Sequence, residues 1–151
     1  MIGLKEIHDM PELMRWRAEV ITEVFGQEPD AELLEANRRY YELHIADGSH
    51  AAFVAERRGV ELGCGAVCFT DELPSPDNPT GRCAYLMNIY VRWPFRNHGV
   101  AHRIVSRLLE EARARGCGKI YLETTPAARP VYTSLGFRDL PDMMKYASLE
   151  A

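Results

Sequence analysis

A short stretch in the middle of the chain, residues 92–103, brings together side chains that could bind an anion. It reads RWPFRNHGVAHR, with three arginines and two histidines directly before an apolar repeat. The residues before it are apolar nearly throughout, as in a buried strand, and those after it have helical spacing. The stretch is therefore predicted to join a strand to a helix start, where free N–H groups and the helix dipole attract an anion.

Three residues in this connection favour a bound diphosphate over a plain turn. Gly99 has no Cβ and lets a ligand approach the backbone, Ala101 is small, and Arg96 adds a charge-assisted donor. The pattern R-x-x-G-x-A is weak by itself, because many strand-to-helix turns contain such residues. The chain holds neither G-x-x-x-x-G-K-[ST] nor G-x-G-x-x-G, so two common nucleotide-binding motifs are absent.

The elements that must position this connection follow from apolar spacing and turn residues. Asp9 and Pro11 mark the start of a first helix, and Gly26 marks its end. The chain is predicted to be α/β with a mixed sheet. The predicted elements are a strand (2–7), two helices (9–26 and 29–48), a hairpin (51–55 and 60–69), an exposed loop (73–81), a strand (84–91), a helix (100–115), a strand (119–122), a short helix (127–135) and a closing β segment (136–146).

Length and charge limit the classes of function. With 151 residues the chain is expected to form one domain, residues 1–151. Its net charge of −4, and the absence of an aromatic stacking motif beside the arginines, argue against nucleic acid and against an anionic membrane as partners. The N-terminal residues do not resemble a signal peptide and no apolar run is long enough to span a bilayer, so we expect a cytoplasmic protein.

Cysteine and histidine offer a metal or redox function as an alternative. The four cysteines form no CxxC pair, and the spacing of Cys64 and Cys68 places both on one face of a strand. His98 and His102 are four residues apart, but no third ligand accompanies them in the sequence. Small buried thiols without a metal are therefore the favoured interpretation.

Two segments resemble signatures of the GNAT N-acetyltransferase superfamily. Residues 86–101, LMNIYVRWPFRNHGVA, resemble its acyl-CoA motif [QR]-x-x-G-x-[GA], and residues 128–137, ARPVYTSLGF, resemble its second signature with a tyrosine and a following Gly-Phe. One helix and one strand separate the two, as in the family. The resemblance covers the chain from about residue 50 to its end, whereas residues 1–48 match only in the type of elements, a strand and two helices.

The resemblance implies a three-layer fold whose mostly antiparallel sheet splays between its middle strands, with the pantetheine arm of acetyl-CoA in the gap. Backbone groups of Ile89, Tyr90 and Val91 would bind this arm like an added strand. The diphosphate would lie on the amides of the following turn, with Arg96 nearby. That turn comprises Asn97, His98, Gly99, Val100, Ala101 and His102. Thr125 would either contact the pantetheine or cap a helix.

The same resemblance implies direct attack of an amine on the thioester. A backbone amide at Ile89 or Tyr90 would polarise the carbonyl, and Tyr132 would give a proton to the leaving thiolate. In many relatives a glutamate that acts as the general base stands where this chain has Met87 and Asn88. The identity of the general base in this chain therefore stays open. The candidates are Glu23, Glu28, His44, Glu123 and a chain of waters.

The sequence predicts an acetyl-CoA-dependent N-acetyltransferase without a metal, acting on a small-molecule or peptide amine. The acceptor would be selected by the second helix and the 73–81 loop. Family members often dimerise, which leaves a homodimer open. The alternative is a non-catalytic acyl-CoA-binding or interaction module with the same fold.

Overall fold

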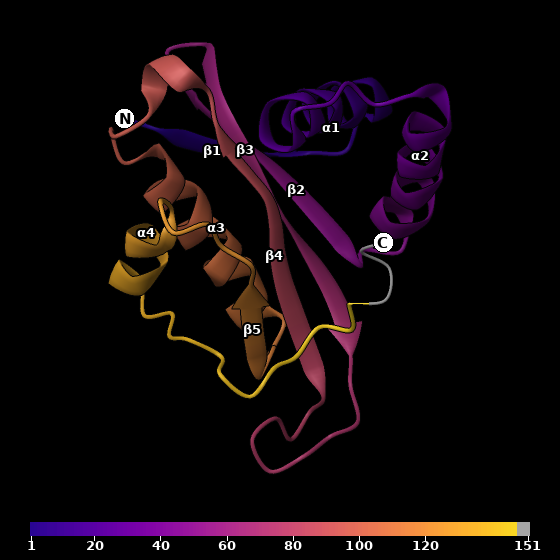
Figure 1. The fold of residues 1–151 in the computed structure, drawn as a ribbon, viewed down its shortest axis with the longest axis vertical. Helices are drawn as coiled ribbons and strands as arrows, with labels where there is room; N and C mark the ends of the chain where they lie inside the picture. The colour runs from indigo at the N-terminus through magenta and orange to yellow at the C-terminus, as the bar shows by residue number, and fades with distance from the viewer. Residues whose placement is uncertain (148–151) are drawn as a thin grey trace.

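A five-stranded mixed sheet forms the middle layer of the computed structural model, which describes residues 1–147 (Figure 1). Its strands lie in the order β1-β2-β3-β4-β5. The first three pairings are antiparallel and β5 is parallel to β4, so the predicted mixed, mostly antiparallel sheet is confirmed. The strands are β1 (Gly3–Ile7), β2 (His50–Arg57), β3 (Val60–Asp71), β4 (Arg82–Val91) and β5 (Lys119–Leu122).

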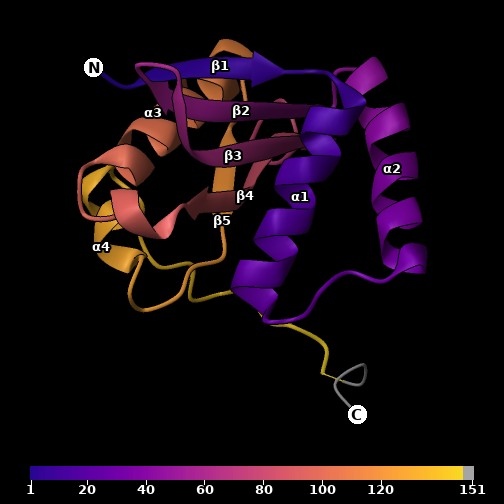
Figure 2. The same ribbon diagram turned by 90° about the horizontal axis from the view of Figure 1, so that it is seen from above.

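Two pairs of helices cover the two faces of this sheet (Figure 2). The helices are α1 (Met10–Phe25), α2 (Ala31–Ala46), α3 (Val100–Ala114) and α4 (Arg129–Ser134), with a 3₁₀ turn, η1 (Trp93–Phe95), after β4. The predicted helix starts are confirmed, because Asp9 and Asp30 accept hydrogen bonds from the N–H groups of Glu12 and Leu33. None of the helices in residues 1–147 is both long and apolar enough to cross a bilayer.

Each face of the sheet has its own hydrophobic cluster. Trp16 and Leu13 of α1 pack with Val54 of β2 on one face. Ile104 and Leu108 of α3 pack with strand residues on the other face. The apolar stripe predicted for α3 is thus its buried side.

β4 carries one more residue than the stretch of β3 opposite it. Met87 pairs with Ala66 and Tyr90 with Cys64, so three steps on β4 match two on β3. The extra residue forms a bulge, in which Asn88 has a left-handed backbone with φ of 56°. Asparagine adopts this conformation more readily than most residues. As a result Met87 and Asn88, although consecutive, both line the α1–α2 side, whereas Ile89 packs toward α3.

β4 and β5 part just before this bulge. Residues Cys83–Leu86 of β4 pair with Lys119–Leu122, and β5 offers no partner beyond Leu86 (Figure 1). Within residues 1–147, the later half of β4 is therefore bonded to β3 on one edge and open on the other. This is the opening predicted from the family resemblance, and β5 is the last strand beside it.

The closing β segment predicted for residues 136–146 is wrong. No strand forms between α4 and residue 147, and this segment runs as coil past the β5 edge toward the α1–α2 side (Figures 1 and 2). Pro141 lies between two aspartates and cannot donate to a ladder, and Met143 and Met144 are exposed instead of alternating between buried and exposed sides. The 73–81 segment is a loop, as predicted. It contains one isolated β-bridge, between Ser75 and Asn78.

Gly65 allows α3 to approach β3 next to the bulge. A Cβ there would lie 2.5 Å from Cγ2 of Ile104 and 3.3 Å from Cδ1 of Leu108. We expect Gly65→Ala to lower the free energy of unfolding by about 1–3 kcal/mol, because the helix must shift. Urea denaturation measures this. Gly3→Ala is the matched control, since its Cβ would meet nothing closer than 3.9 Å; equal stability of the two variants would contradict the close approach.

Candidate functional site

The backbone between β4 and α3 forms an open turn in front of the helix. Asn97 and Gly99 both have left-handed backbones, with φ of 64° and 79°. A Cβ on Gly99 would meet no heavy atom within 4 Å, so the space beside it is free for a ligand. We call residues 96–102 the phosphate turn.

The first N–H groups of α3 point out of this turn without an acceptor in the helix. Arg103 donates the first helical hydrogen bond, 3.1 Å long, to the carbonyl oxygen of Gly99. The N–H groups of Val100, Ala101 and His102 precede it, and no side chain caps this end. Such a helix start, with the positive end of its dipole, binds phosphate groups.

The three arginines of the sequence stretch have different roles. Arg92 makes two 2.8 Å hydrogen bonds to the carboxylate of Glu19 and lies 4.3 Å from the Trp16 ring, and thus ties β4 to α1. The hydrogen bond from Arg92 lowers the pKa of Glu19. Arg103 donates to the carbonyl of Ile2 at 3.3 Å. Arg96 alone stays beside the phosphate turn: its Nε donates to the carbonyl of Val91 at 2.9 Å and its side chain is exposed.

His98 completes the phosphate turn, and its Nδ1 lies 2.7 Å from the carbonyl oxygen of Arg96. Next to the turn, Ile89, Tyr90 and Val91 form the part of β4 that β5 leaves open. Arg92 donates its N–H to Leu62 of β3, so strand alternation directs the N–H groups of Val91 and Ile89 to the open edge. Burial and the charge of Glu19 raise the pKa of Tyr90 to about 12.

Tyr132 lies on α4, buried in the cluster that α3 forms with the sheet. Its ring packs edge-on against Phe137, with 5.8 Å between centroids. Burial raises the pKa of its phenol, which therefore keeps its proton at neutral pH. Thr125 precedes α4, and its hydroxyl accepts a hydrogen bond from the N–H of Ala128 at 3.3 Å, so it caps the turn that leads into the helix.

A pocket of about 400 Å³ lies on the α1–α2 side of the opening, and sequence reasoning missed most of its residues. We call it the acceptor pocket, because the acceptor amine is expected beside the second helix. The second helix, one of the two segments predicted to select the acceptor, lines this pocket, whereas no residue of the 73–81 loop does. Residue spacing gave no signal for Arg17 or Tyr85, which come from segments far apart in the chain. The lining residues are Arg17, Ala36, Asn37, Tyr40, Tyr41, His50, Cys68, Tyr85, Met87 and Asn88.

The residues predicted as a general base differ in their relation to this pocket. Glu23 and Glu28 are exposed, and His44 is bonded to the hydroxyl of Ser49 at 2.6 Å. Glu123 follows β5 and accepts a 3.0 Å hydrogen bond from Tyr85, a pocket residue. Burial and this carboxylate raise the pKa of Tyr85 to about 12. Glu123 is exposed too, but it contacts the pocket residue Tyr85, and His44 likewise contacts the pocket residue Tyr40.

A buried polar group forms the floor of the acceptor pocket. The hydroxyl of Tyr40 lies 2.9 Å from Nδ1 of His50 and 3.0 Å from Sγ of Cys68, while Nε2 of His50 is buried without a partner in the described chain. Burial lowers the pKa of His50 to about 4 and raises that of Cys68. Cys64 and Cys68 face the same side, as predicted. No group of three metal-ligating side chains that could hold an ion occurs among residues 1–147.

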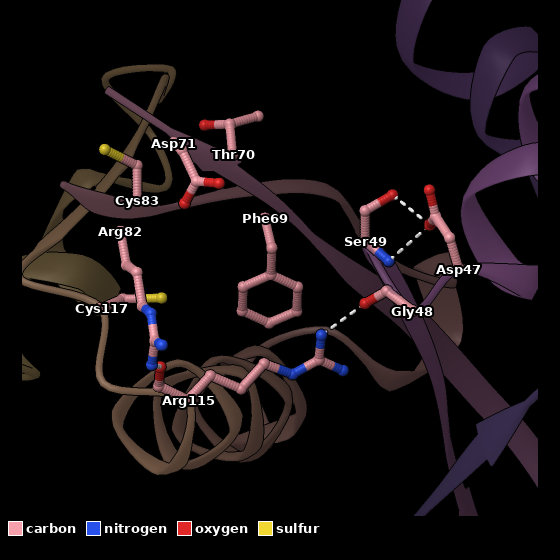
Figure 3. Close-up of a pocket in the computed structure, with 10 residues that line it drawn as sticks. All are labelled: Asp47, Gly48, Ser49, Phe69, Thr70, Asp71, Arg82, Cys83, Arg115 and Cys117. Atoms are coloured by element: carbon pink, nitrogen blue, oxygen red, sulfur yellow. Dashed lines mark hydrogen bonds between the residues drawn. The ribbon is translucent and has the colours of Figure 1, made fainter. Parts of the chain in front are cut away.

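A second pocket, of about 450 Å³, lies at the far ends of β4 and α3 (Figure 3). Three of its charged side chains, those of Asp47, Arg82 and Arg115, form hydrogen bonds with neighbouring groups. Arg115 donates to the carbonyl of Gly48 and stacks 3.8 Å from the Phe69 ring, and Asp47 accepts two hydrogen bonds from Ser49. None of the predicted site residues lines this pocket.

A family model and a solved structure both match this chain to acetyltransferases. The family model of the acetyltransferase (GNAT) family matches residues 10–137. A crystal structure of a predicted acetyltransferase from Clostridium acetobutylicum with acetyl-CoA has a TM-score of 0.87 at 27% identity, covering 100% of this chain and 99% of that one.

Two curated relatives match in sequence. Glucosamine 6-phosphate N-acetyltransferase 1 of Oryza sativa subsp. japonica is 32% identical over 101 residues, 66% of this chain and 59% of that protein. Thialysine N-epsilon-acetyltransferase of Sus scrofa is 35% identical over 66 residues, 42% of this chain and 39% of that protein. The matched segments thus span less than two thirds of the length of either relative.

The low pKa of His50 predicts a pH-dependent stability. Between pH 6.5 and about 4 the unfolded chain binds a proton at His50 that the folded chain does not, so the free energy of unfolding falls as the pH falls, by about 3 kcal/mol over this window. Urea denaturation at pH 7.5, 6 and 5 should show a shallower loss in His50→Gln than in the wild type. His8→Gln, at an exposed histidine, serves as control and should follow the wild type. Parallel profiles for wild type and His50→Gln would contradict the prediction.

Proposed function

The chain belongs to the GNAT acetyltransferase family, and on this premise we propose that it transfers an acetyl group from acetyl-CoA to a primary amine of a small molecule. The observation that carries the proposal is the joint presence of the phosphate turn and the open edge of β4, side by side at the end of one strand. The acceptor pocket opens on the other side of that strand.

The residues present fit acetyl-CoA in three respects. The diphosphate fits the free N–H groups of Val100, Ala101 and His102, because the missing Cβ of Gly99 leaves space in front of them. Arg96 can direct its terminal nitrogens to the same charge. The pantetheine arm fits the open edge of β4, where the N–H groups of Ile89 and Val91 point outward.

Residues of the chain also meet the chemical needs of acetyl transfer. The N–H of Ile89, rather than that of Tyr90, faces the open edge and can stabilise negative charge on the thioester oxygen. Tyr132 is protonated at neutral pH and can donate a hydrogen bond, and then its proton, to the leaving sulfur. When bound, acetyl-CoA supplies the activated acetyl group.

The amine must lose a proton to become a nucleophile, and we assign this step to Glu123. Its carboxylate is 3.0 Å from the Tyr85 hydroxyl at the margin of the acceptor pocket, where an ammonium group can approach it. Glu123 therefore replaces the glutamate that is absent from β4, at positions 87 and 88. The curated relatives are named for acetylating glucosamine 6-phosphate and thialysine, both small amines, which supports an acceptor of that class.

Binding of acetyl-CoA should depend on the space beside Gly99. In Gly99→Glu the carboxylate enters the phosphate turn and repels the diphosphate, so we expect affinity for acetyl-CoA and CoA to fall at least tenfold by calorimetry. Gly48→Glu introduces the same side chain at the same φ of 79°, also facing open space, at the far end of the sheet. This control should bind normally. Equal losses in both variants would remove the phosphate turn from the proposal.

Turnover should depend on the hydroxyl of Tyr132. We expect Tyr132→Phe to bind acetyl-CoA with unchanged affinity and to release CoA thiol at a kcat lower by about 10²–10⁴-fold, because the general acid is lost. The measurement is amine-dependent thiol release over a panel of small amines. A variant with full kcat would exclude Tyr132 as the acid. Acetyl-CoA binding with no turnover of any amine in the wild type would instead favour the non-catalytic module.

A further inference from the structure

Arg17 brings an uncompensated positive charge into the acceptor pocket. It lies on α1, partly buried, and forms no ion pair with any carboxylate among residues 1–147. Its partners are neutral: Nη1 donates to Oδ1 of Asn88 at 2.7 Å, and Nε donates to Oδ1 of Asn37 at 3.1 Å. Arg92 also contacts α1, but its charge is neutralised by Glu19 of that helix. The charge of Arg17 is therefore held in place without being cancelled.

The two asparagines fix the direction of the guanidinium. Asn37 donates its Nδ2 to the carbonyl of Leu33 at 2.9 Å, which leaves its Oδ1 for Arg17. Asn88 presents its amide from the bulge, where its left-handed backbone turns it to this face. A guanidinium has five N–H donors, and these bonds use two of them. The remaining donors form a preorganised fork of the kind that binds carboxylate and phosphate groups.

The surroundings of Arg17 strengthen its effect on an anion. The pocket walls next to it are largely apolar, with Ala36, Tyr41 and Met87 among them. Burial is the main cause of the low pKa of His50 and of the raised pKa of Tyr41, and the charge of Arg17 adds to the first shift and opposes the second. A charge that is weakly screened in this way attracts an entering anion more than a surface arginine would.

The sheet side of the pocket carries the opposite charge. Tyr85 lines the pocket and donates its hydroxyl to Glu123 at the end of β5. A molecule in the pocket thus meets a guanidinium from α1 and, on the sheet side, Tyr85, whose hydroxyl leads to the carboxylate of Glu123. An amine directed to the carboxylate places the rest of the molecule toward Arg17.

We propose that Arg17, held by Asn37 and Asn88, is a specificity subsite that binds an anionic group, carboxylate or phosphate, of the acceptor amine. This rests on the proposed function for the identity of the pocket as the acceptor site. The acceptor class is then a small molecule with a primary amine at one end and an acidic group at the other. Neutral amines of equal size lack the charged hydrogen bonds and bind more weakly.

Matched pairs of probes test this proposal. The phosphate pair is glucosamine 6-phosphate and glucosamine, and the carboxylate pair is 6-aminohexanoate and 6-aminohexanamide. Each is titrated calorimetrically into the full chain, with and without saturating CoA. We expect the anionic member of at least one pair to bind tenfold or more tightly than its neutral partner. The pair that shows the larger ratio identifies the anion as phosphate or carboxylate.

Two variants locate the effect. In Arg17→Gln the ratio should fall to about twofold or less, while the affinity for CoA is unchanged, which also shows that the variant is folded. Arg15→Gln removes an exposed arginine of the same helix that pairs with Glu61 outside the pocket, and it should keep the ratio. A ratio near one for both pairs in the wild type, or a ratio that survives Arg17→Gln, overturns the proposal. Failure of the wild type to bind CoA would overturn the proposed function instead. The two outcomes are distinguishable, because the ratio of probe affinities is also measured in the absence of CoA.

Discussion

The extra residue in β4 is the constraint on which the rest of the site depends. It interrupts the regular alternation of the strand at Asn88, so that Met87 and Asn88 both face the α1–α2 side. It also lies two residues after Leu86, the last β4 residue that pairs with β5. A single irregularity thus places two of the residues that line the acceptor pocket and adjoins the open edge. Gly65 of β3 accompanies it, because only a residue without Cβ leaves room for α3 at this level.

The arginines of the molecule differ in whether they are paired within the structure or have donors available to a ligand. Arg92 is paired with Glu19. Arg115 is paired with Glu111 and donates to a loop carbonyl, and both arginines thus join helices to other segments of the chain. Arg96, in the phosphate turn, and Arg17, in the acceptor pocket, keep terminal donors that no carboxylate among residues 1–147 binds. Counting arginines therefore says little about binding, whereas the partners of each guanidinium decide which of them can meet a ligand.

The sequence predicted those features that depend on local signals. Asp9 and Asp30 before apolar repeats marked helix starts, and Gly99 between a strand and a helix marked the phosphate turn. The bulge was not predictable, because residues 84–91 read as a continuous apolar strand. The contact of Arg17 with Asn88 joins positions 71 residues apart, and no periodicity encodes it. The closing β segment does not form although apolar residues occur near position 144, because Pro141 cannot donate to a ladder and Met143 and Met144 are both exposed.

The shortness of β5 has a consequence for how copies of the chain meet. As the last strand of the sheet within residues 1–147, it presents an edge whose backbone groups could pair with another chain. That edge is only four residues long, and its first residue is Lys119, whose ammonium group is paired with Glu72. Addition of another chain at this edge would gain few hydrogen bonds and would have to accommodate the Lys119–Glu72 ion pair. β5 itself thus exposes too little strand to seed a growing intermolecular sheet, and within residues 1–147 the open half of β4 is the longer unpaired edge on this side of the sheet.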